Sequence, residues 1–407
     1  MSRVHVLLLN QYYAPSGAAT AQLLADLGAH LAGAGHRVTA VCSRRSYPDP
    51  SGLYPTSETI DGVRIHRTWT TGFGRASRIG RMCDYLGFMI GAVRVLAVQR
   101  EVDVIVSLTT PPFVATLGLA AARVRGARSL YWVMDVYPDL AFELGVLEPR
   151  SVAGRLLAAL ARLTVRRYDA VVAIGESMAR RLRSAGAERV TVVHNWADGS
   201  AIRPLPADSH ALRESWGWTG RFVVLYSGNL GLTHEFDTVL GAADALRDER
   251  RVLFAFVGDG PCRAGVEREA ARRGLTNVAF RPHVGRDELG QSLTAGDVHL
   301  VTLRDAAVGL VVPSKIYGVL AAGRPTLYVG PEAGEVGEIV RRGRCGVRVE
   351  IGDAPGLARA VRAYLQDERH LLDDGRRARE LFERDFTKVR MLEAHRRVIE
   401  SLADDAP

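Results

Sequence analysis

Residues 221–237 read Arg-Phe-Val-Val-Leu-Tyr-Ser-Gly-Asn-Leu-Gly-Leu-Thr-His-Glu-Phe-Asp. The stretch opens with an apolar run that is typical of a buried strand, and from Phe236 to Leu246 apolar residues recur at helical spacing. Gly228 and Gly231 in the loop between them let the backbone come close to a ligand, and the helix start offers free N–H groups and a positive dipole end. The pattern predicts a strand–loop–helix unit that can seat a phosphate, although a tight turn of an ordinary α/β protein accounts for the same residues.

The length and composition of the chain favour a two-domain protein with substantial cores. The sequence has 407 residues, of which 47% are hydrophobic, and two domains are the natural expectation for this length. Its net charge of +8 suits anionic partners such as nucleotide phosphates or an acidic membrane surface, while a genome that prefers Arg to Lys accounts for the same surplus. The sequence has no zinc-finger spacing and no RNA-recognition motif, so we expect no nucleic-acid partner.

The cysteines and the apolar segments favour a cytoplasmic protein. The four cysteines lie far apart without CxxC spacing, which fits a reduced cytosol and implies neither a disulfide framework nor a metal cluster. The apolar run Val4–Leu9 is too short for a secretory signal. Residues 104–122 carry no charge and nearly reach membrane-spanning length, but Thr109-Thr-Pro-Pro112 interrupts them. We therefore expect a strand, a turn and a helix there, and only peripheral contact with a membrane.

Strand and helix patterns alternate in both halves of the chain, which predicts two doubly wound α/β domains. The predicted strands of the first half are Val4–Leu9, Arg37–Cys42, Val63–Trp69, Val104–Leu108, Ser129–Met134, Ala170–Ile174 and Val190–His194. Those of the second half are Phe222–Tyr226, Val252–Val257, Val278–Phe280, Val298–Thr302, Thr326–Val329 and Val347–Val349.

Residues 198–220 separate the halves and have the composition of a linker with a short helix, and two long polar helical patterns, Asp353–Gln366 and Phe386–Ala403, close the chain. Ligands of open α/β sheets bind at the carboxyl ends of the strands, so two sheets that face each other would enclose a deep interdomain cleft.

Seven segments, in order and at matching spacing, make the chain resemble a retaining glycosyltransferase of the GT-B class, family 4, over nearly all of its 407 residues. In the first half these segments are Asn10–Ala19, Trp132–Asp139 and Val193–Asp198. In the second half they are Ser227–Gly231, Val257–Pro261, Phe280–Val284 and Val312–Pro325. Each segment alone is weakly specific, whereas four of them at family spacing in one half of the chain are strongly specific. The Ser-Gly-Asn and Val-Pro-Ser-Lys versions resemble amino-sugar transferases that build bacterial O-antigen and exopolysaccharide.

The resemblance implies a fold, two substrates and a location. It implies two Rossmann-like domains across a cleft, with acceptor binding at residues 1–200, donor binding at 201–385 and a last helix at 386–407 that crosses back to the first domain. The implied donor is a UDP-sugar. The implied acceptor is a polyprenyl-diphosphate-linked glycan at the cytoplasmic face of the inner membrane. The family needs no metal or other cofactor, which agrees with the lack of an Asp-x-Asp loop and of metal-ligand spacing in the sequence.

The resemblance also implies which residues bind the substrates. For the donor they are Ser227, Gly228, Asn229, Gly231, His234, Gly258, Asp259, Gly260, Arg281, His283, Val284, Pro313, Ser314 and Lys315. For the acceptor side they are Tyr13, Pro15, Ser16, Gly17 and Asn195. For some of these residues a purely structural role is the alternative. The Gly-Asp-Gly step can be a simple turn, Arg281 can be a surface residue, and Asn195 can form a hydrogen bond between the domains.

Two charged residues are the candidates for catalysis. Ser314 can cap a helix that runs to Ala322, which places Lys315 in the first turn. Because a cation there opposes the helix dipole by about a few tenths of a kcal/mol, stability does not favour it, whereas an anionic ligand reverses the sign. Asp135 follows an apolar strand. It is either a helix cap or, as the resemblance implies, the group that takes the proton of the acceptor hydroxyl.

Four ligands of the common family pattern are missing from this chain. Asn229 and His234 stand where the family carries the Arg and the Lys that grip the diphosphate. Leu310 and Gly318 stand where it carries two Glu residues, the second of which binds the ribose.

Other groups must replace these ligands. The negative charge of UDP must then be stabilised by backbone N–H groups, helix dipoles and Lys315, with His234 or Arg281 as further candidates. Glu335 and Glu338 follow the next strand and are the candidates for the ribose hydroxyls.

Arg78–Gln99 is predicted to be a helix in which basic and large apolar residues alternate. It is either a covering helix with its polar face outward or a surface that receives a lipid-linked acceptor at the membrane, as interfacial helices do.

The expected reaction is retaining transfer of a sugar from UDP to a glycan hydroxyl, on one face of the sugar and without a covalent intermediate. Lys315 and the 227–231 loop stabilise the departing diphosphate, and the proton goes to that group or is shared with Asp135. The alternatives are a nucleotide-sugar 2-epimerase or sugar-phosphate transferase of the same fold, and a catalytically silent binding subunit. A dinucleotide-dependent oxidoreductase is disfavoured, because no strand is followed by GxGxxG with an acidic residue about 20 positions on.

Overall fold

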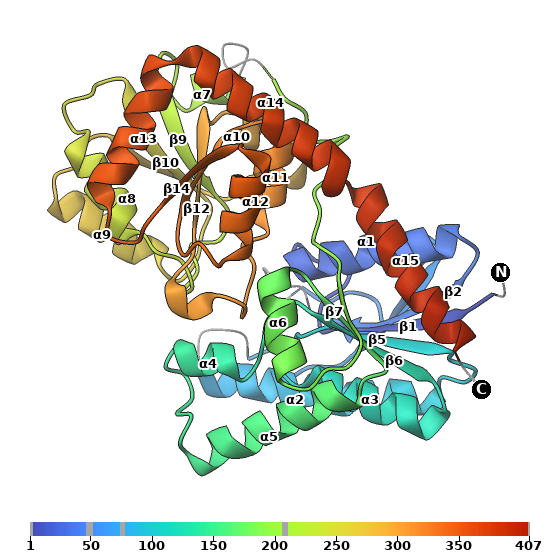
Figure 1. The fold of residues 1–407 in the computed structure, drawn as a ribbon. Helices are drawn as coiled ribbons and strands as arrows, with labels where there is room; N and C mark the ends of the chain where they lie inside the picture. Colours follow the sequence, from blue (N-terminus) through green and yellow to red (C-terminus); the bar gives the residue numbers. More distant parts are fainter. Residues whose placement is uncertain (1–2, 46–51, 74–77, 206–210, 406–407) are drawn as a thin grey trace. The chain divides into compact units, whose positions relative to one another are not determined.

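A computed structural model describes residues 3–45, 52–73, 78–205 and 211–405, and Figure 1 shows the course of the chain. The chain divides into two compact units. Unit 1 consists of Met1–His194 together with Met391–Pro407, and unit 2 consists of Asn195–Arg390. Each unit is built on its own sheet of mostly parallel strands.

Unit 1 holds an eight-stranded sheet in the order β3-β4-β2-β1-β5-β6-β7-β8, in which only β3 and β4 pair antiparallel. Its strands are β1 (His5–Leu9), β2 (Arg37–Ser43), β3 (Ser57–Ile60), β4 (Val63–Thr68), β5 (Val104–Ser107), β6 (Arg128–Val133), β7 (Ala170–Ala173) and β8 (Val190–Val192). β1 is buried along its whole length, as expected for a parallel strand whose sheet is covered on both faces. Because β1 lies between β2 and β5, its carboxyl end is the topological switch point of the sheet.

Helices cover both faces of this sheet. They are α1 (Ala19–Gly33), α2 (Arg78–Val98), α3 (Val114–Arg125), α4 (Asp139–Glu143), α5 (Val152–Arg167), α6 (Glu176–Ser184) and α15 (Lys388–Asp404). In Figure 1, α2, α3 and α5 lie on one face, and α1 and α15 lie side by side on the other. The α2–α3 side encloses a core cluster that includes Leu7, Val41, Phe88 and Ile105.

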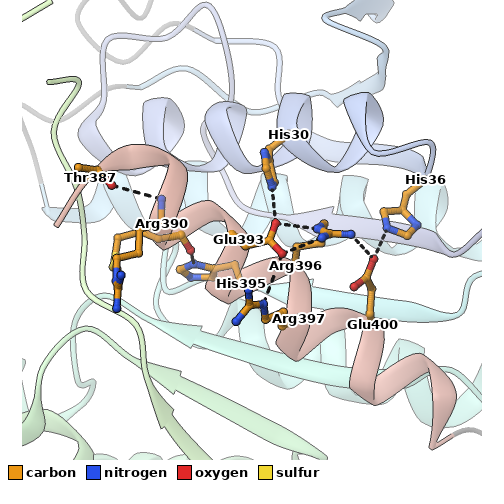
Figure 2. A network of polar contacts seen from close by, with 10 residues as sticks. His30, His36, Thr387, Arg390, Glu393, His395, Arg396, Arg397 and Glu400 are labelled. Atoms are coloured by element: carbon orange, nitrogen blue, oxygen red, sulfur yellow. Dashed lines mark hydrogen bonds and ion pairs between the residues drawn. The ribbon is translucent and has the colours of Figure 1, made fainter. Parts of the chain in front are cut away.

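The last helix, α15, is held against α1 and the sheet of unit 1 by a polar network (Figure 2). The N–H of Val4 donates to Nδ1 of His36 at 3.3 Å, so Nε2 of that ring carries the proton toward Glu400, whose Oε1 lies 3.0 Å away. His395 of α15 also packs its ring against Trp132 of β6, with the ring centroids 4.3 Å apart. Figure 2 also shows the contacts of Glu393 with His30, Arg396 and Arg397.

Unit 2 holds a six-stranded parallel sheet in the order β11-β10-β9-β12-β13-β14. Its strands are β9 (Phe222–Ser227), β10 (Val252–Val257), β11 (Val278–Arg281), β12 (Val298–Thr302), β13 (Thr326–Val329) and β14 (Gly346–Val349). β9 and β10 are buried at every residue. β9 lies between β10 and β12, so the switch point of this sheet falls at the carboxyl end of β9, where the 228–236 loop begins.

Core clusters pack helices against both faces of the unit 2 sheet. The helices are α7 (Ala211–Ser215), α8 (Asp237–Ala245), α9 (Arg263–Arg272), α10 (Leu289–Thr294), α11 (Lys315–Ala321), α12 (Glu335–Gly343), α13 (Ala354–Gln366) and α14 (Glu368–Asp385). One cluster joins the sheet to α8, α9 and α13, with Val239, Val266 and Leu357 as members. Another joins it to α11, α12 and α14.

The structure confirms the two α/β domains, the strand–turn–helix passage at 104–125 and the short helix of the linker, α7; residues 206–210 of that linker lie outside the described ranges. Two elements were missed. β3 is a half-exposed polar edge strand whose sequence, Ser-Glu-Thr-Ile, carries no buried face. α14 is an 18-residue helix with many charges, and only a narrow stripe that includes Ala378, Leu381 and Phe382 reaches the core.

Candidate functional site

Two glycine loops pack backbone against backbone at the carboxyl ends of β9 and β10. The N–H of Gly228 donates to Val257 O at 2.9 Å, and the N–H of Leu230 donates to Asp259 O at 2.8 Å. Gly258 has φ 142°, and a Cβ at this position would overlap the carbonyl oxygen of Gly228. Gly258 is thus required for the close approach of the two loops, and this approach gives the 228–231 loop a fixed shape.

Lys315 is the buried cation of this region. It is the first residue of α11, and its Nζ lies 3.4 Å from the centroid of the Tyr226 ring. A Cβ on Gly228 would lie 3.8 Å from the same Nζ, so the ammonium stands beside the loop after β9. Nζ is inaccessible to solvent and has no hydrogen-bond partner among the described residues. Burial lowers the pKa of Lys315 well below its ordinary value, because the charged form has lost its hydration.

Ser314 lies at the N-cap position of α11 but does not cap it, contrary to the prediction. Its side chain makes no capping hydrogen bond, and its backbone is helical with φ −61° and ψ −16°. A capping side chain needs the extended backbone that turns its oxygen toward the N–H groups of the first turn. The helix also ends at Ala321, one residue before the predicted end. The side chain of Ser314 is exposed, and the preceding Pro313 is buried.

Tyr226 connects the loop to Lys315, and its role was not foreseen. Its hydroxyl donates to Asn229 O at 2.8 Å, which fixes the loop, while the face of its ring carries the ammonium of Lys315. The ring also packs edge-on against His234 and Phe236. The sequence did carry a signal, since a Tyr near the end of an apolar strand has a hydroxyl that needs a hydrogen-bond partner.

His234 does not supply the positive charge that the sequence suggested for it. Its Nδ1 lies 2.6 Å from Thr302 O, and because a carbonyl only accepts, Nδ1 carries the hydrogen. Burial and the nearby Lys315 lower the pKa of His234 to about 3. The ring is therefore neutral near pH 7, and Nε2 presents a lone pair, which suits a hydroxyl donor better than a phosphate.

Arg304 is a cation at the same switch point that sequence reasoning missed. It lies two residues after β12, its N–H donates to Thr233 O and its Nε donates to His234 O, both at 2.9 Å. Its side chain is exposed. The rule that ligands bind at strand ends would have identified it, because β12 is the neighbour of β9 across the switch point.

The other predicted donor residues divide into those near this loop and those engaged elsewhere. The guanidinium of Arg281 donates to Trp216 O at 2.9 Å and to Phe280 O at 3.3 Å, so this side chain serves the packing of β11. His283 is exposed, and Val284 packs against the cluster around Trp218. The structure therefore does not bring the side chain of Arg281 to Lys315.

The other residues predicted to bind the donor from these two loops lie at or just after the carboxyl ends of β9 and β10. Ser227 is the buried last residue of β9, Gly231 is buried, and Asn229 and Asp259 are exposed. The Oδ1 of Asp259 accepts from the N–H of Gly260 at 2.8 Å.

The two ribose candidates lie in different surroundings. Glu338 is on the surface, where its Oε1 pairs with Arg341 Nη2 at 2.7 Å across one turn of α12. Glu335, the first residue of α12, is buried, and its charge contributes to the raised pKa of Tyr317 on α11. Glu335 therefore lies near the helix that carries Lys315, and Glu338 is committed to an exposed ion pair.

In unit 1, the loop after β1 separates into a packed part and an open tip. Tyr13 is buried against α1, where its hydroxyl occupies the space that a side chain at position 28 would need. Pro15 and Gly17 are exposed, and Gly17 faces open space. Ser16 is buried, and its Oγ has no hydrogen-bond partner in the described ranges. Tyr13 and Ser16 thus belong to the packed part of the loop, whereas Pro15 and Gly17 are its accessible positions.

Asp135 lies two residues after β6 and is not a helix cap, since the N-cap of α4 is Pro138. Burial raises the pKa of Asp135 to about 6. Burial raises the pKa of Tyr131 and of Tyr137, and the charge of Asp135 raises both further. Both tyrosines line a small cavity together with Phe113. A carboxyl that titrates near neutral pH at a strand end has the protonation behaviour of a general base.

Asn195 is buried at the start of unit 2, and its Oδ1 has no hydrogen-bond partner within the described part of the chain. Within the same ranges, no three His, Cys, Asp or Glu side chains lie close enough together to hold a metal ion.

Two protein-family models match the chain, one in each half. A glycosyl transferase 4-like domain matches residues 17–196, and a glycosyl transferases group 1 domain matches residues 221–367. The second match contains every donor-side residue described above, from Ser227 to Glu338.

Two bacterial relatives are also described as glycosyltransferases. The probable glycosyltransferase WbjE of Pseudomonas aeruginosa is 29% identical over 275 residues, which cover 66% of this chain and 68% of that protein. The putative colanic acid biosynthesis glycosyl transferase WcaI of Escherichia coli K12 is 28% identical over 352 residues, which cover 82% of this chain and 85% of that protein.

Solved structures share the fold. Sucrose-phosphate synthase of Thermosynechococcus elongatus superposes with a TM-score of 0.78 at 16% identity, over 98% of this chain and 99% of that one. HepE of Anabaena, in complex with UDP and glucose, superposes with a TM-score of 0.75 at 17% identity, over 98% of this chain and 100% of that one.

Proposed function

Because the chain belongs to the GT-B-type glycosyltransferases of bacterial polysaccharide synthesis, we propose that it moves a sugar from a UDP-sugar to a hydroxyl of a polyprenyl-diphosphate-linked glycan. The observation that carries this proposal is the ammonium of Lys315, which is buried beside the glycine loop of β9 without a hydrogen-bond partner in the described chain. An isolated buried charge is unfavourable in the ligand-free protein, and an anionic ligand removes that cost. The structures of HepE in complex with UDP and with UDP-glucose support UDP as the nucleotide.

The donor diphosphate would contact three kinds of group in unit 2. The backbone N–H groups of the 228–231 loop are held in place by the glycine packing, Lys315 supplies the buried charge, and Arg304 supplies an exposed charge at the neighbouring strand end. His234 is neutral, and its Nε2 would accept a hydroxyl of the sugar. Glu335 is the proposed partner of the ribose, since it is buried near α11.

In the proposed reaction the bond between the anomeric carbon and the β-phosphate oxygen breaks, and a bond from the acceptor oxygen to that carbon forms on the same face. The configuration is retained and no covalent enzyme intermediate forms. The acceptor proton passes to the departing phosphate oxygen or is shared with Asp135, whose pKa of about 6 leaves it mostly ionised at pH 7. The charge that develops on the leaving diphosphate is met by Lys315, so no metal is required in this scheme.

The same proposal places the reaction at the cytoplasmic face of the inner membrane, where a polyprenyl-linked glycan is accessible. The implied pathway is O-antigen or exopolysaccharide assembly, in line with the colanic acid description of WcaI.

The proposal is tested by incubating the purified protein, with EDTA present, with a panel of UDP-sugars and extracted lipid-linked glycans, and by analysing products with mass spectrometry. The expected result is a glycan extended by one sugar together with free UDP. An epimerised donor without glycan product would instead indicate a nucleotide-sugar epimerase. The absence of both products and of UDP binding in calorimetry would indicate a silent subunit.

A further inference from the structure

Exposed apolar side chains concentrate on the outer side of the α2–α3–α5 layer of unit 1. Among the residues that the structure describes, eleven of the twenty exposed large apolar side chains belong to these three helices. They are Ile79, Met82, Leu86, Ile90, Val93 and Val98 on α2, Val124 on α3, and Val152, Leu156, Leu160 and Leu163 on α5.

The spacing of these residues forms a continuous stripe on each of the two long helices. On α2 five of them recur every three or four residues from Ile79 to Val93, and on α5 they do so from Val152 to Leu163. Positions on the opposite side of each helix, such as Phe88 and Val165, are already buried. An amphipathic helix of a globular protein needs one apolar side, so core packing does not account for the second, outward stripe.

The two helices lie in one layer, so their outward stripes share one side of unit 1. α3 lies between them, with Arg125 of α3 donating to Gln99 O beyond the end of α2 at 3.2 Å and Thr116 of α3 bonded to Thr164 of α5 at 3.1 Å. Figure 1 shows the three helices together on the side of the sheet away from α1 and α15.

The charged side chains that the structure shows exposed on α2 and α5 are all arginines. α5 carries exposed Arg155, Arg162, Arg166 and Arg167 and has no acidic residue. The single acidic residue of α2, Asp84, is partly buried and accepts hydrogen bonds from the backbone N–H groups of Gly72 and Phe73. Arg155 and Arg162 have no described carboxylate within ion-pair distance, in contrast to the α15 side of the sheet, where Arg and Glu pair (Figure 2). Apolar stripes bordered by unpaired cations are typical of helices that lie on an anionic bilayer.

An aromatic loop extends this surface beside α2. Trp69 and Phe73 are 63% and 67% exposed. The carboxylate of Asp84 accepts from the N–H groups of Gly72, at 2.5 Å, and of Phe73, at 3.1 Å, which ties the loop to α2. The Trp69 ring lies next to Gly87 of α2. Exposed aromatic rings that are held rigidly beside a basic apolar face match the aromatic belt of membrane–water interfaces.

We propose that this docking surface, made of the outward stripes of α2 and α5 with Trp69, Phe73 and the bordering arginines, binds a bilayer that contains anionic phospholipids. The surface spreads over two helices and a loop with one sign of charge, which suits a broad anionic plane. None of the described helices is long and apolar enough to span a membrane, so the contact is with the surface of the bilayer.

The docking surface adjoins the Asp135 half-site. Burial raises the pKa of Tyr137, and nearby charged groups change it further: Asp135 and Tyr85 of α2 raise it, and Arg81 of α2 lowers it. A lipid headgroup at the depth of α2 would therefore lie close to the proposed acceptor residues. In this respect the inference rests on the proposed function, because it describes how a lipid-linked acceptor reaches Asp135.

The test is co-sedimentation of the full-length protein with vesicles of phosphatidylcholine alone and of phosphatidylcholine with phosphatidylglycerol. The variants are Leu86→Glu on α2 and, as a matched control, Leu372→Glu on α14, whose leucine is similarly exposed. We expect binding to the anionic vesicles, a loss of about tenfold for Leu86→Glu, no change for Leu372→Glu, and weaker binding of Arg155→Gln/Arg162→Gln to anionic vesicles only.

The inference is overturned if the wild-type protein ignores both vesicles or if Leu86→Glu binds like the control. It is also overturned if sedimentation velocity shows a dimer that Leu86→Glu dissociates while vesicles are not bound, since the surface would then belong to a second copy. Transfer to a soluble acceptor analogue separates this inference from the proposed function. Transfer without vesicle binding rejects the docking surface alone, and vesicle binding without transfer rejects the function alone.

Discussion

The two predicted half-sites, the Lys315 region of unit 2 and the Asp135 region of unit 1, contain ionisable groups of opposite charge whose pKa values are shifted by burial. In unit 2, Lys315 is a cation whose Nζ is inaccessible and whose pKa is lowered, and in unit 1, Asp135 is a carboxyl whose pKa is raised to about 6. Burial is the main cause in both cases. The two groups differ in their need: Lys315 has no hydrogen-bonded anion among the described residues, whereas Asp135 keeps its proton to a higher pH than an exposed carboxyl does. The comparison suggests that unit 2 is built to receive a phosphate and unit 1 to receive a proton.

The loops near the two groups differ in how firmly they are held. The 228–231 loop, which we predict to bind the donor, is fixed by its packing against the 258–261 loop and by the hydroxyl of Tyr226. The loop after β1, which we predict to bind the acceptor, exposes Pro15 and Gly17. A fixed loop can preorganise N–H groups for a diphosphate of constant shape, while an open tip suits an acceptor whose structure varies between pathways.

The largest effect is expected from Lys315→Met, which removes the proposed counter-charge. We expect turnover to fall about a hundredfold, the range for loss of one preorganised electrostatic group. The melting temperature of the ligand-free protein should rise, because a buried unpaired charge is replaced by an apolar chain of similar size. Turnover is measured by UDP release. Lys388, the other lysine of the chain, is the control, since Lys388→Met leaves the donor loop intact. A folded Lys315→Met enzyme of normal turnover would contradict the role.

A smaller effect, about tenfold in turnover, is expected from Asp135→Asn, because the departing diphosphate also accepts the proton. In the wild-type enzyme kcat/KM should fall as the pH drops through about 6, where the carboxyl takes up a proton, and this acid limb should disappear in the variant. An unchanged limb in the variant would assign the proton transfer to another group.

Asp135 also affects stability with a defined sign. Its pKa is raised from 3.8 to about 6, so between these values the folded protein binds more protons than the unfolded chain. Its contribution is therefore largest below the unfolded pKa and is lost as the pH rises through about 6. We expect Asp135→Asn to be more stable than wild type at pH 7 and less different at pH 4, as measured by urea unfolding.

Arg304→Gln tests whether the exposed cation assists the buried one. We expect UDP affinity to fall about fivefold, a surface-charge effect that weakens as salt is added. The salt dependence of UDP binding is the measurement. An affinity loss that persists at high salt would mean that Arg304 acts mainly through its hydrogen bond to His234 O.

The smallest effect is expected from Tyr226→Phe, which keeps the ring under Lys315 and removes the hydrogen bond to Asn229 O. A neutral hydrogen bond contributes about 1 kcal/mol, so UDP affinity should fall roughly fivefold at most, with the pH profile unchanged. A loss as large as that of Lys315→Met would mean that loop shape, rather than charge, dominates the donor half-site.

The sequence allowed the buried framework to be predicted because periodicity reports burial directly. Every described strand except the polar edge strand β3 was found in this way, and the position of Ser314 before the helix placed Lys315 in the first turn of α11. Side-chain partners across the fold were not, since they depend on tertiary neighbours. The carbonyl of Trp216 that engages Arg281, the carbonyl of Thr302 that fixes the tautomer of His234, and the helical backbone that prevents Ser314 from capping leave no mark on the local pattern.

The most direct test of the central claim is calorimetry of UDP and of uridine with the wild-type protein and with Lys315→Met. If Lys315 is the counter-charge of the diphosphate, the wild-type protein prefers UDP over uridine, and the variant loses at least about tenfold of that preference while its affinity for uridine stays the same. An unchanged preference for UDP, or an equal loss for both ligands, would contradict the account.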